Sequence, residues 1–143
     1  MLIGISPLVN PDLLSTLYRM GHGDEIVLAD AHFPGESCNK NLIRADGLKI
    51  PDLLDGILPL IPPDEYVEYP LVMMAAVKGD LLDPRVEESY MDKITRYWNS
   101  HNKIERIERF AFYKRTKSAF AVVMTGETAK YGNIILKKGV VPV

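Results

Sequence analysis

Residues 20–34 read Met20-Gly21-His22-Gly23-Asp24-Glu25-Ile26-Val27-Leu28-Ala29-Asp30-Ala31-His32-Phe33-Pro34. Glycine permits tight backbone turns, so we expect His22, which stands between two glycines, on a turn rather than in a core. An apolar run of strand type follows, and Asp30 closes it. An imidazole and a carboxylate at the two borders of one strand suit proton transfer near neutral pH. On spacing alone the plainer interpretation is the stronger: a helix-to-strand connection with a solvated histidine.

The length of the predicted strand separates the two groups. A strand rises about 3.3 Å per residue, so five strand residues place its ends roughly 17 Å apart. His22 and Asp30 should therefore not touch unless a loop folds back or the two residues belong to different subunits. A site shared between subunits is one of the hypotheses that the sequence raises.

Helical and strand patterns alternate along the rest of the chain. Asn10-Pro11-Asp12 and Asp83-Pro84 combine a capping side chain with a proline, which is typical of helix starts. We expect helices that begin at Asn10, Ile50, Asp83 and Arg109, and strands over 25–29, 71–77, 104–107, 119–124 and 133–136, with a polar connection over 44–49. This alternation predicts an α/β fold: a three-layer α/β/α single domain, residues 1–143, with a central mostly parallel sheet.

Composition sets the class of protein and of partner. The chain has 143 residues, of which 47% are hydrophobic and 25% charged, as in soluble globular proteins. A net charge of −2 indicates neither nucleic acid nor a membrane surface as partner. The single cysteine, Cys38, fits a reducing compartment, and no secretory signal opens the sequence, so we expect a cytoplasmic protein.

Two further clusters carry candidate chemistry. In the first, residues 109–115, Arg109 can donate two hydrogen bonds in a fixed fork, whereas Lys114 and Arg115 are interpreted as solvated bases of an amphipathic helix. In the second, residues 125–133, a tyrosine and an asparagine flank Gly132 and offer donors to a sugar or a carboxylate. A simple turn with Gly132 at positive φ is an equal alternative.

Other chemistries lack their motifs. The sequence has no phosphate-binding glycine loop, no dinucleotide fingerprint and no nucleophile elbow. It also lacks the paired histidine or cysteine spacings of metal sites, so we expect no metal and no cofactor.

The three clusters, in this order, resemble the ribose pyranase / L-fucose mutarotase family. The similar segments span nearly the whole chain: 20–26, 30–34, 43–47, 71–77, 109–113, 125–127 and 131–140. Within the family, Arg44-Ala45-Asp46-Gly47, Arg109-Phe110-Ala111-Phe112-Tyr113 and Lys137-Lys138-Gly139 favour the fucose branch. The ribose branch has a histidine at the position of Arg109.

The resemblance implies a function and a site. His22 would be the catalytic acid/base of a monosaccharide anomerase, and Asp30, Arg109, Tyr131, Gly132 and Asn133 would bind the sugar, L-fucose, without a cofactor. It also implies a ring-shaped homo-oligomer, a decamer, with each site at a subunit boundary. A sugar-binding module without catalysis, and a ribose pyranase, remain the alternatives. The roles of Tyr113 and His32 stay open.

Overall fold

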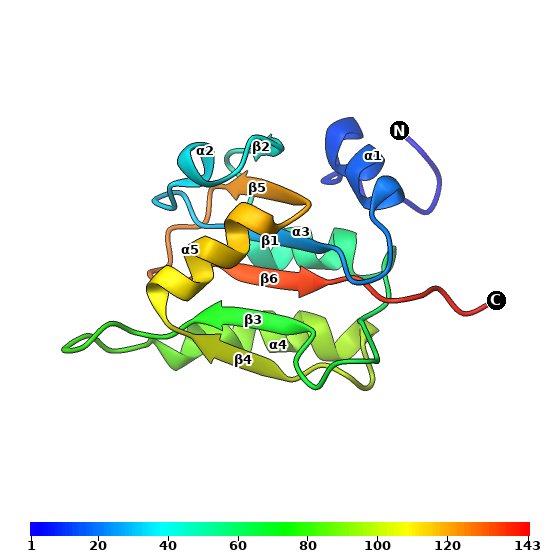
Figure 1. Cartoon of the computed structure of the whole chain (residues 1–143). Helices are drawn as coiled ribbons and strands as arrows, with labels where there is room; N and C mark the ends of the chain where they lie inside the picture. Colours follow the sequence, from blue (N-terminus) through cyan, green and yellow to red (C-terminus); the bar gives the residue numbers. More distant parts are fainter.

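A six-stranded mixed sheet forms the centre of the protein. The computed structural model describes residues 1–143. The strands are β1 (Glu25–Ala29), β2 (Leu42–Ala45), β3 (Leu71–Met74), β4 (Ile104–Ile107), β5 (Ala121–Thr125) and β6 (Ile134–Lys137). Their order is β2-β5-β1-β6-β3-β4, and β6 alone runs antiparallel to its neighbours (Figure 1). The predicted mostly parallel sheet is confirmed.

Helices cover both faces of the sheet. They are α1 (Pro11–Arg19), α2 (Gly35–Cys38), α3 (Ile50–Ile57), α4 (Pro84–Tyr97) and α5 (Arg109–Ser118). One core joins α1, α3 and α4 to one face, and a second core joins α2 and α5 to the other. Residues of β1 alternate between these cores, as the period of two in a strand requires. The protein is therefore the three-layer α/β/α domain that the sequence predicts. No helix combines the length and apolar character needed to cross a membrane.

Local signals fix the helix starts. The Asn10 side chain accepts the Leu13 N–H at 2.9 Å, and the Asp83 side chain accepts the Arg85 N–H at 3.0 Å. A proline occupies the first helical position of both α1 and α4, where its missing N–H matters least. Both predicted caps are confirmed.

Some sequence-based expectations were wrong. Strand β2 takes in Arg44, so the polar connection starts later than predicted, and the single turn α2 was not anticipated. Elements of four residues are too short to show a clear period. The strand expected over 71–77 ends at Met74. Arg115 is not a solvated base, because its guanidinium contacts the Glu25 carboxylate at 2.6 Å and ties α5 to β1.

The direction of β6 shapes the edge where a site can form. The carboxyl ends of the five parallel strands lie at one edge of the sheet, and the amino end of the antiparallel β6 lies at the same edge. Asn133, which precedes β6, is thereby brought beside Asp30, which follows β1. Ligand sites of open α/β sheets form outside this edge.

Candidate active site

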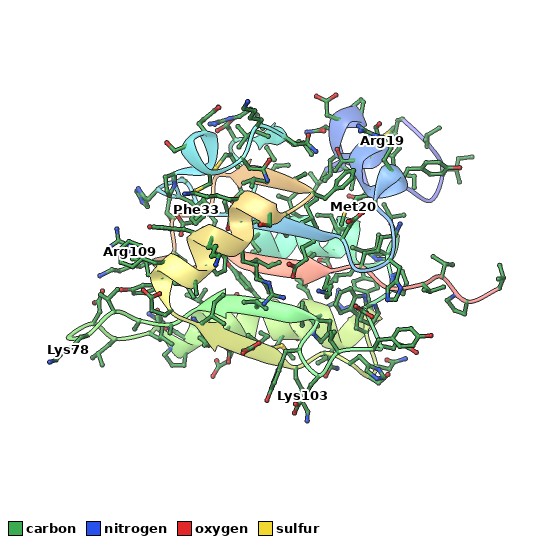
Figure 2. The ribbon with its side chains drawn as sticks, viewed as in Figure 1. Arg19, Met20, Phe33, Lys78, Lys103 and Arg109 are labelled. Atoms are coloured by element: carbon green, nitrogen blue, oxygen red, sulfur yellow. The ribbon has the colours of Figure 1, made fainter.

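A cavity of about 210 Å³ opens at the carboxyl edge of the sheet. Each of the three sequence clusters contributes at least one side chain to its walls. The lining residues are Asp30, His32, Phe33, Pro34, Met74, Val77, Arg109, Tyr113, Lys130, Tyr131 and Asn133. Figure 2 shows Phe33 and Arg109 at this end of the sheet. Pockets for drug-sized ligands are about 300–1,000 Å³, so this one suits a smaller molecule. Its mixture of apolar walls and a few polar groups is typical of a small-molecule site.

Asp30 and Asn133 form the buried polar floor of the cavity. Only 5% of Asp30 and 4% of Asn133 is exposed. The Asp30 N–H donates to Asn133 Oδ1 at 2.7 Å, so the amide donor of this side chain remains for a ligand. The Asp30 carboxylate accepts the His32 N–H at 2.9 Å. Burial raises the pKa of the Asp30 carboxyl, although the contacts with His32 and Asn133 act in the opposite direction.

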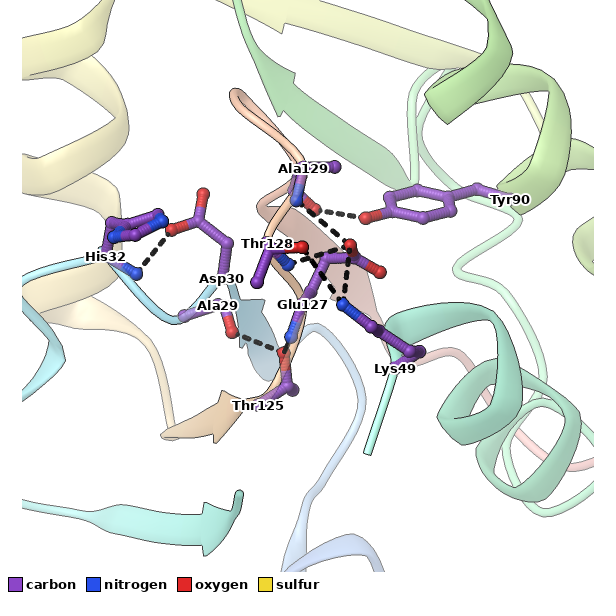
Figure 3. A network of polar contacts seen from close by, with 10 residues as sticks. Ala29, Asp30, His32, Lys49, Tyr90, Thr125, Glu127, Thr128 and Ala129 are labelled. Carbon is purple, nitrogen blue, oxygen red and sulfur yellow. Dashed lines mark hydrogen bonds and ion pairs between the residues drawn. The ribbon is translucent and has the colours of Figure 1, made fainter. Parts of the chain in front are cut away.

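Hydrogen bonds to Glu127 hold the loop that carries Tyr131 and Asn133. The Glu127 carboxylate accepts the N–H groups of Thr128 and Ala129 at 2.9 and 3.0 Å, and Lys49 approaches the same oxygen at 3.8 Å (Figure 3). The backbone of Glu127 also accepts the Ala31 N–H at 2.7 Å. This network ties the loop after β5 to the loop after β1.

Tyr131 adopts a backbone conformation that is rare for a residue with a bulky side chain. Its φ is +58°, which lies in the left-handed region that favours glycine. The alternative prediction, a turn with Gly132 at positive φ, is wrong, because the φ of Gly132 is not positive. The Tyr131 hydroxyl donates to Asp80 at 2.7 Å. Hydrogen bonds from Lys130 and from Tyr131 lower the pKa of Asp80. Strained residues of this kind cluster at ligand sites, where surrounding contacts hold them.

Position 132 requires a glycine because neighbouring atoms lie too close for a Cβ, and not because of its φ. A Cβ at this position would lie 2.8 Å from the Ala129 carbonyl oxygen and 3.0 Å from the Tyr90 hydroxyl. The Tyr90 hydroxyl donates to the Gly132 carbonyl at 2.7 Å. Burial raises the pKa of the Tyr90 phenol, which keeps it protonated as a donor.

Arg109 stands at the mouth of the cavity. It is the first residue of α5, and the Glu108 side chain caps this helix by accepting the N–H groups of Phe110 and Ala111. Arg109 Nε donates to the Tyr113 hydroxyl at 3.2 Å, and its guanidinium lies 5.5 Å from the centre of the Tyr113 ring. These contacts hold the exposed guanidinium of Arg109 at the cavity, and they pair it with no carboxylate.

His22 lies at the opposite edge of the sheet. It belongs to the turn before β1, two residues after Met20, and Figure 2 shows Met20 and Arg109 toward opposite ends of the sheet. Its Nε2 lies 3.0 Å from Asp64 Oδ1, its ring centre lies 5.2 Å from that of Tyr66, and 45% of its side chain is exposed. Within one chain, the structure brings together Asp30, Arg109, Tyr131 and Asn133 around the cavity, and it does not bring His22 to them.

Sequence reasoning missed part of this arrangement. Met74, the last residue of β3, lines the cavity, and Met73 lies in the core. Tyr113 and His32 also line the cavity. Nothing in the sequence pointed to Asp64 or to Asp80, because each meets its partner through tertiary structure. No three His, Cys, Asp or Glu side chains lie together where a metal ion could bind.

Comparisons with known proteins agree with this architecture. The pattern of the RbsD / FucU transport protein family matches residues 3–141. The L-fucose mutarotase of Actinobacillus pleuropneumoniae is 59% identical over 143 residues, which is 100% of this chain and 99% of that protein. The L-fucose mutarotase of Histophilus somni is 58% identical over the same span.

Solved structures extend the similarity to the fold. The fucose mutarotase of Streptococcus pneumoniae in complex with L-fucose has a TM-score of 0.93 and 49% identity, covering 99% of this chain and 100% of its own. RbsD of Bacillus subtilis complexed with D-ribose has a TM-score of 0.76 and 25% identity, with coverage of 99% and 100%. The chain belongs to the RbsD / FucU transport protein family.

Proposed function

We propose that this protein is an L-fucose mutarotase, an isomerase that interconverts the α and β anomers of L-fucose. The observation that carries the proposal is the cavity at the carboxyl edge, where Asp30, Arg109, Tyr131 and Asn133 converge. The relatives named L-fucose mutarotase, at 57–59% identity over the whole chain, support the same conclusion.

The sugar would be held by a small set of polar groups. Asp30 accepts a sugar hydroxyl, while Arg109 and the Asn133 amide donate to others. The Tyr131 hydroxyl donates its own proton to Asp80, so its oxygen serves the sugar as an acceptor. The backbone around Gly132 approaches the ring between the Tyr131 and Asn133 side chains. Phe33 and Met74 supply apolar wall, which suits the methyl group of a 6-deoxy sugar.

The reaction needs one acid/base and moves no net proton. Ring opening breaks the C1–O5 bond and sends its electron pair to O5, which takes up a proton. The anomeric hydroxyl loses its proton, and its O–H electron pair forms the C1=O1 bond of the aldehyde. Rotation of the aldehyde and reversal of these steps give the other anomer. His22 is the residue proposed for the transfer, since an imidazole donates and accepts protons near neutral pH.

His22 and the cavity belong to one site only if two copies of the chain assemble. A neighbouring copy would place its exposed His22 at the mouth of the cavity, which lies at the other edge of the sheet. We therefore propose a homo-oligomeric ring, a decamer, with composite sites and a cytoplasmic location. Closed rings form when the same head-to-tail contact repeats around an axis.

Two alternatives make different predictions. A sugar-binding module would use the same cavity and leave anomer exchange unaccelerated. A ribose pyranase would act faster on D-ribose than on L-fucose, but Arg109 and the 25% identity to the D-ribose complex disfavour it.

NMR exchange spectroscopy on each sugar at anomeric equilibrium separates these functions. We expect the wild type to produce cross-peaks between the α and β anomers of L-fucose, with slower exchange for D-ribose. His22→Ala should abolish the cross-peaks while the oligomer remains intact by size-exclusion chromatography. Saturable binding of L-fucose without acceleration by the wild type would refute the enzymatic proposal.

A further inference from the structure

Asp80 contacts the wall of the sugar cavity from outside. It lies in the loop between β3 and α4, residues 75–83, and is not one of the lining residues. Its Oδ2 accepts the Tyr131 hydroxyl at 2.7 Å, across 51 positions of sequence, and lies 2.5 Å from Lys130 Nζ. A carboxylate that does not line the cavity therefore holds two residues that do.

A local turn presents this carboxylate. The Asp80 N–H donates to the Val77 carbonyl at 3.0 Å and closes a four-residue turn. Gly79, the third residue of the turn, has a φ of +87°, which glycine adopts without strain. Figure 2 shows Lys78, the second residue, on the same side of the molecule as Arg109. The turn thus delivers Asp80 to the end of the sheet where the cavity opens.

The start of the loop is fixed to the neighbouring strand β4. Arg106 Nη1 donates to the Met74 carbonyl at 2.7 Å, and the Ala75 N–H donates to the Ile107 carbonyl at 2.7 Å. Since Met74 itself lines the cavity, the loop begins at the cavity wall. Its position is set by the fold before any sugar binds.

The hydrogen bonds of Tyr131 leave its oxygen one acceptor position. Hydrogen bonds from Lys130 and Tyr131 lower the pKa of Asp80, so its carboxylate is ionised near neutral pH and only accepts. The single hydroxyl hydrogen of Tyr131 is therefore donated to Asp80. The Tyr131 oxygen also accepts the Val77 N–H at 3.3 Å, which occupies one of its two electron pairs. The other pair remains for a ligand.

We propose that Asp80 is a positioning residue that sets sugar specificity through Tyr131: it takes the only hydroxyl proton of Tyr131, so that the phenolic oxygen accepts a hydrogen bond from one sugar hydroxyl and cannot donate one. This inference rests on the proposed mutarotase function. A sugar with a hydroxyl at that position is bound. A sugar with fluorine or hydrogen there is rejected, because the acceptor in the cavity is left unpaired.

Fluorinated sugars test this directly. In the four monofluoro derivatives of L-fucose, each hydroxyl in turn is replaced by fluorine, which cannot donate a hydrogen bond. Titration calorimetry gives Kd for each with the wild type and with Asp80→Ala. At the position that meets Tyr131, we expect fluorine to weaken wild-type binding by about tenfold. In Asp80→Ala the Tyr131 hydroxyl is free to turn its hydrogen toward the fluorine, so this penalty should fall to about twofold.

The other three positions serve as internal controls. Their fluorine penalties reflect Asp30, Arg109 and Asn133, which do not contact Asp80, and should be the same in both proteins. A loop that only supports the fold would instead weaken all five sugars alike. Penalties that Asp80→Ala leaves unchanged at all four positions would overturn the proposal.

Substitutions of Tyr131 test whether Asp80 acts through it. Asp80→Ala should raise Kd for L-fucose by about three- to tenfold and leave kcat within about twofold of the wild type, since Asp80 does not touch the reacting atoms. In a Tyr131→Phe background it should raise Kd no further, and additive losses would overturn the coupling. Asp80→Asn should restore Kd to within about twofold of the wild type, because Lys130 only donates and so orients the amide oxygen toward itself and Tyr131.

Asp92→Ala provides the matched control. The Asp92 side chain is 71% exposed on α4 and pairs with Arg96 at 3.8 Å, so its loss also removes a surface carboxylate paired with a cation. It should keep the wild-type Kd, kcat and fluorine penalties. A wild-type Kd in Asp80→Ala would overturn the role of Asp80 and leave the mutarotase function standing. A wild type that binds L-fucose without accelerating exchange would refute the proposed function, while the Kd values would still decide the role of Asp80. A wild type that does not bind L-fucose would overturn both.

Discussion

The hydroxyl of Tyr90 links the helix layer to the loop that lines the cavity, and its removal has a calculable effect. Tyr90 is 1% exposed on α4, and its hydroxyl donates to the buried Gly132 carbonyl at 2.7 Å. Tyr90→Phe keeps the ring in the core and deletes only this donor. Loss of a partner from a buried polar group lowers the free energy of unfolding by about 1–3 kcal/mol.

Urea denaturation followed by circular dichroism measures this loss, at one protein concentration because assembly stabilises the fold. The matched control is Tyr18→Phe, since Tyr18 is 90% exposed on α1. We also expect KM for L-fucose to rise, because the freed carbonyl lies between Tyr131 and Asn133. A free energy of unfolding and a KM both equal to those of Tyr18→Phe would refute the reasoning.

Three further predictions concern the cavity. Gly132→Ala should lower stability by about 1–3 kcal/mol and abolish sugar binding, since its Cβ must displace the Ala129 carbonyl 2.8 Å away; thermal melting and titration with L-fucose check this. Arg109→Ala should raise KM more than it lowers kcat, and an unchanged KM would remove its anchoring role. Burial raises the pKa of Asp30, so the folded state binds this proton more tightly than the unfolded state does, and its ionisation destabilises the fold as pH rises through that pKa. Asp30→Asn should therefore melt above the wild type at pH 7, with a difference that shrinks on acidification, and a lower melting temperature at pH 7 would contradict this.

Much of the fold could be predicted because its signals are local. Asn10 with Pro11, and Asp83 with Pro84, mark the starts of α1 and α4, and the apolar run after Glu25 marks β1. These features act within a few residues of each other, so they can be read along the chain. By contrast, β2 has four residues and an exposed Arg44 in its middle, which makes it resemble a polar connection.

The contacts that organise the site are not local. Asn133 meets Asp30 across 103 positions, because β6 runs against the other strands. His22 meets Asp64 across 42 positions, through backbone contacts with the end of β6. The sequence could therefore supply His22, Asp30 and Asn133 and their chemical types. It could not supply Asp64, and the grouping of these residues at two opposite edges required the structure.

A site that draws His22 from one copy and the cavity from another makes a claim that mixing two variants can test. His22→Ala lacks the acid/base, and Asp30→Asn replaces the carboxylate of the cavity by a neutral amide, so each alone should accelerate exchange of L-fucose anomers poorly. In hetero-oligomers co-assembled from equal amounts, random assortment gives about one quarter of the sites an intact His22 and an intact cavity. The account predicts recovery of about one quarter of the wild-type exchange rate by NMR. No recovery above the separate variants, in complexes shown to contain both chains, would contradict the composite site.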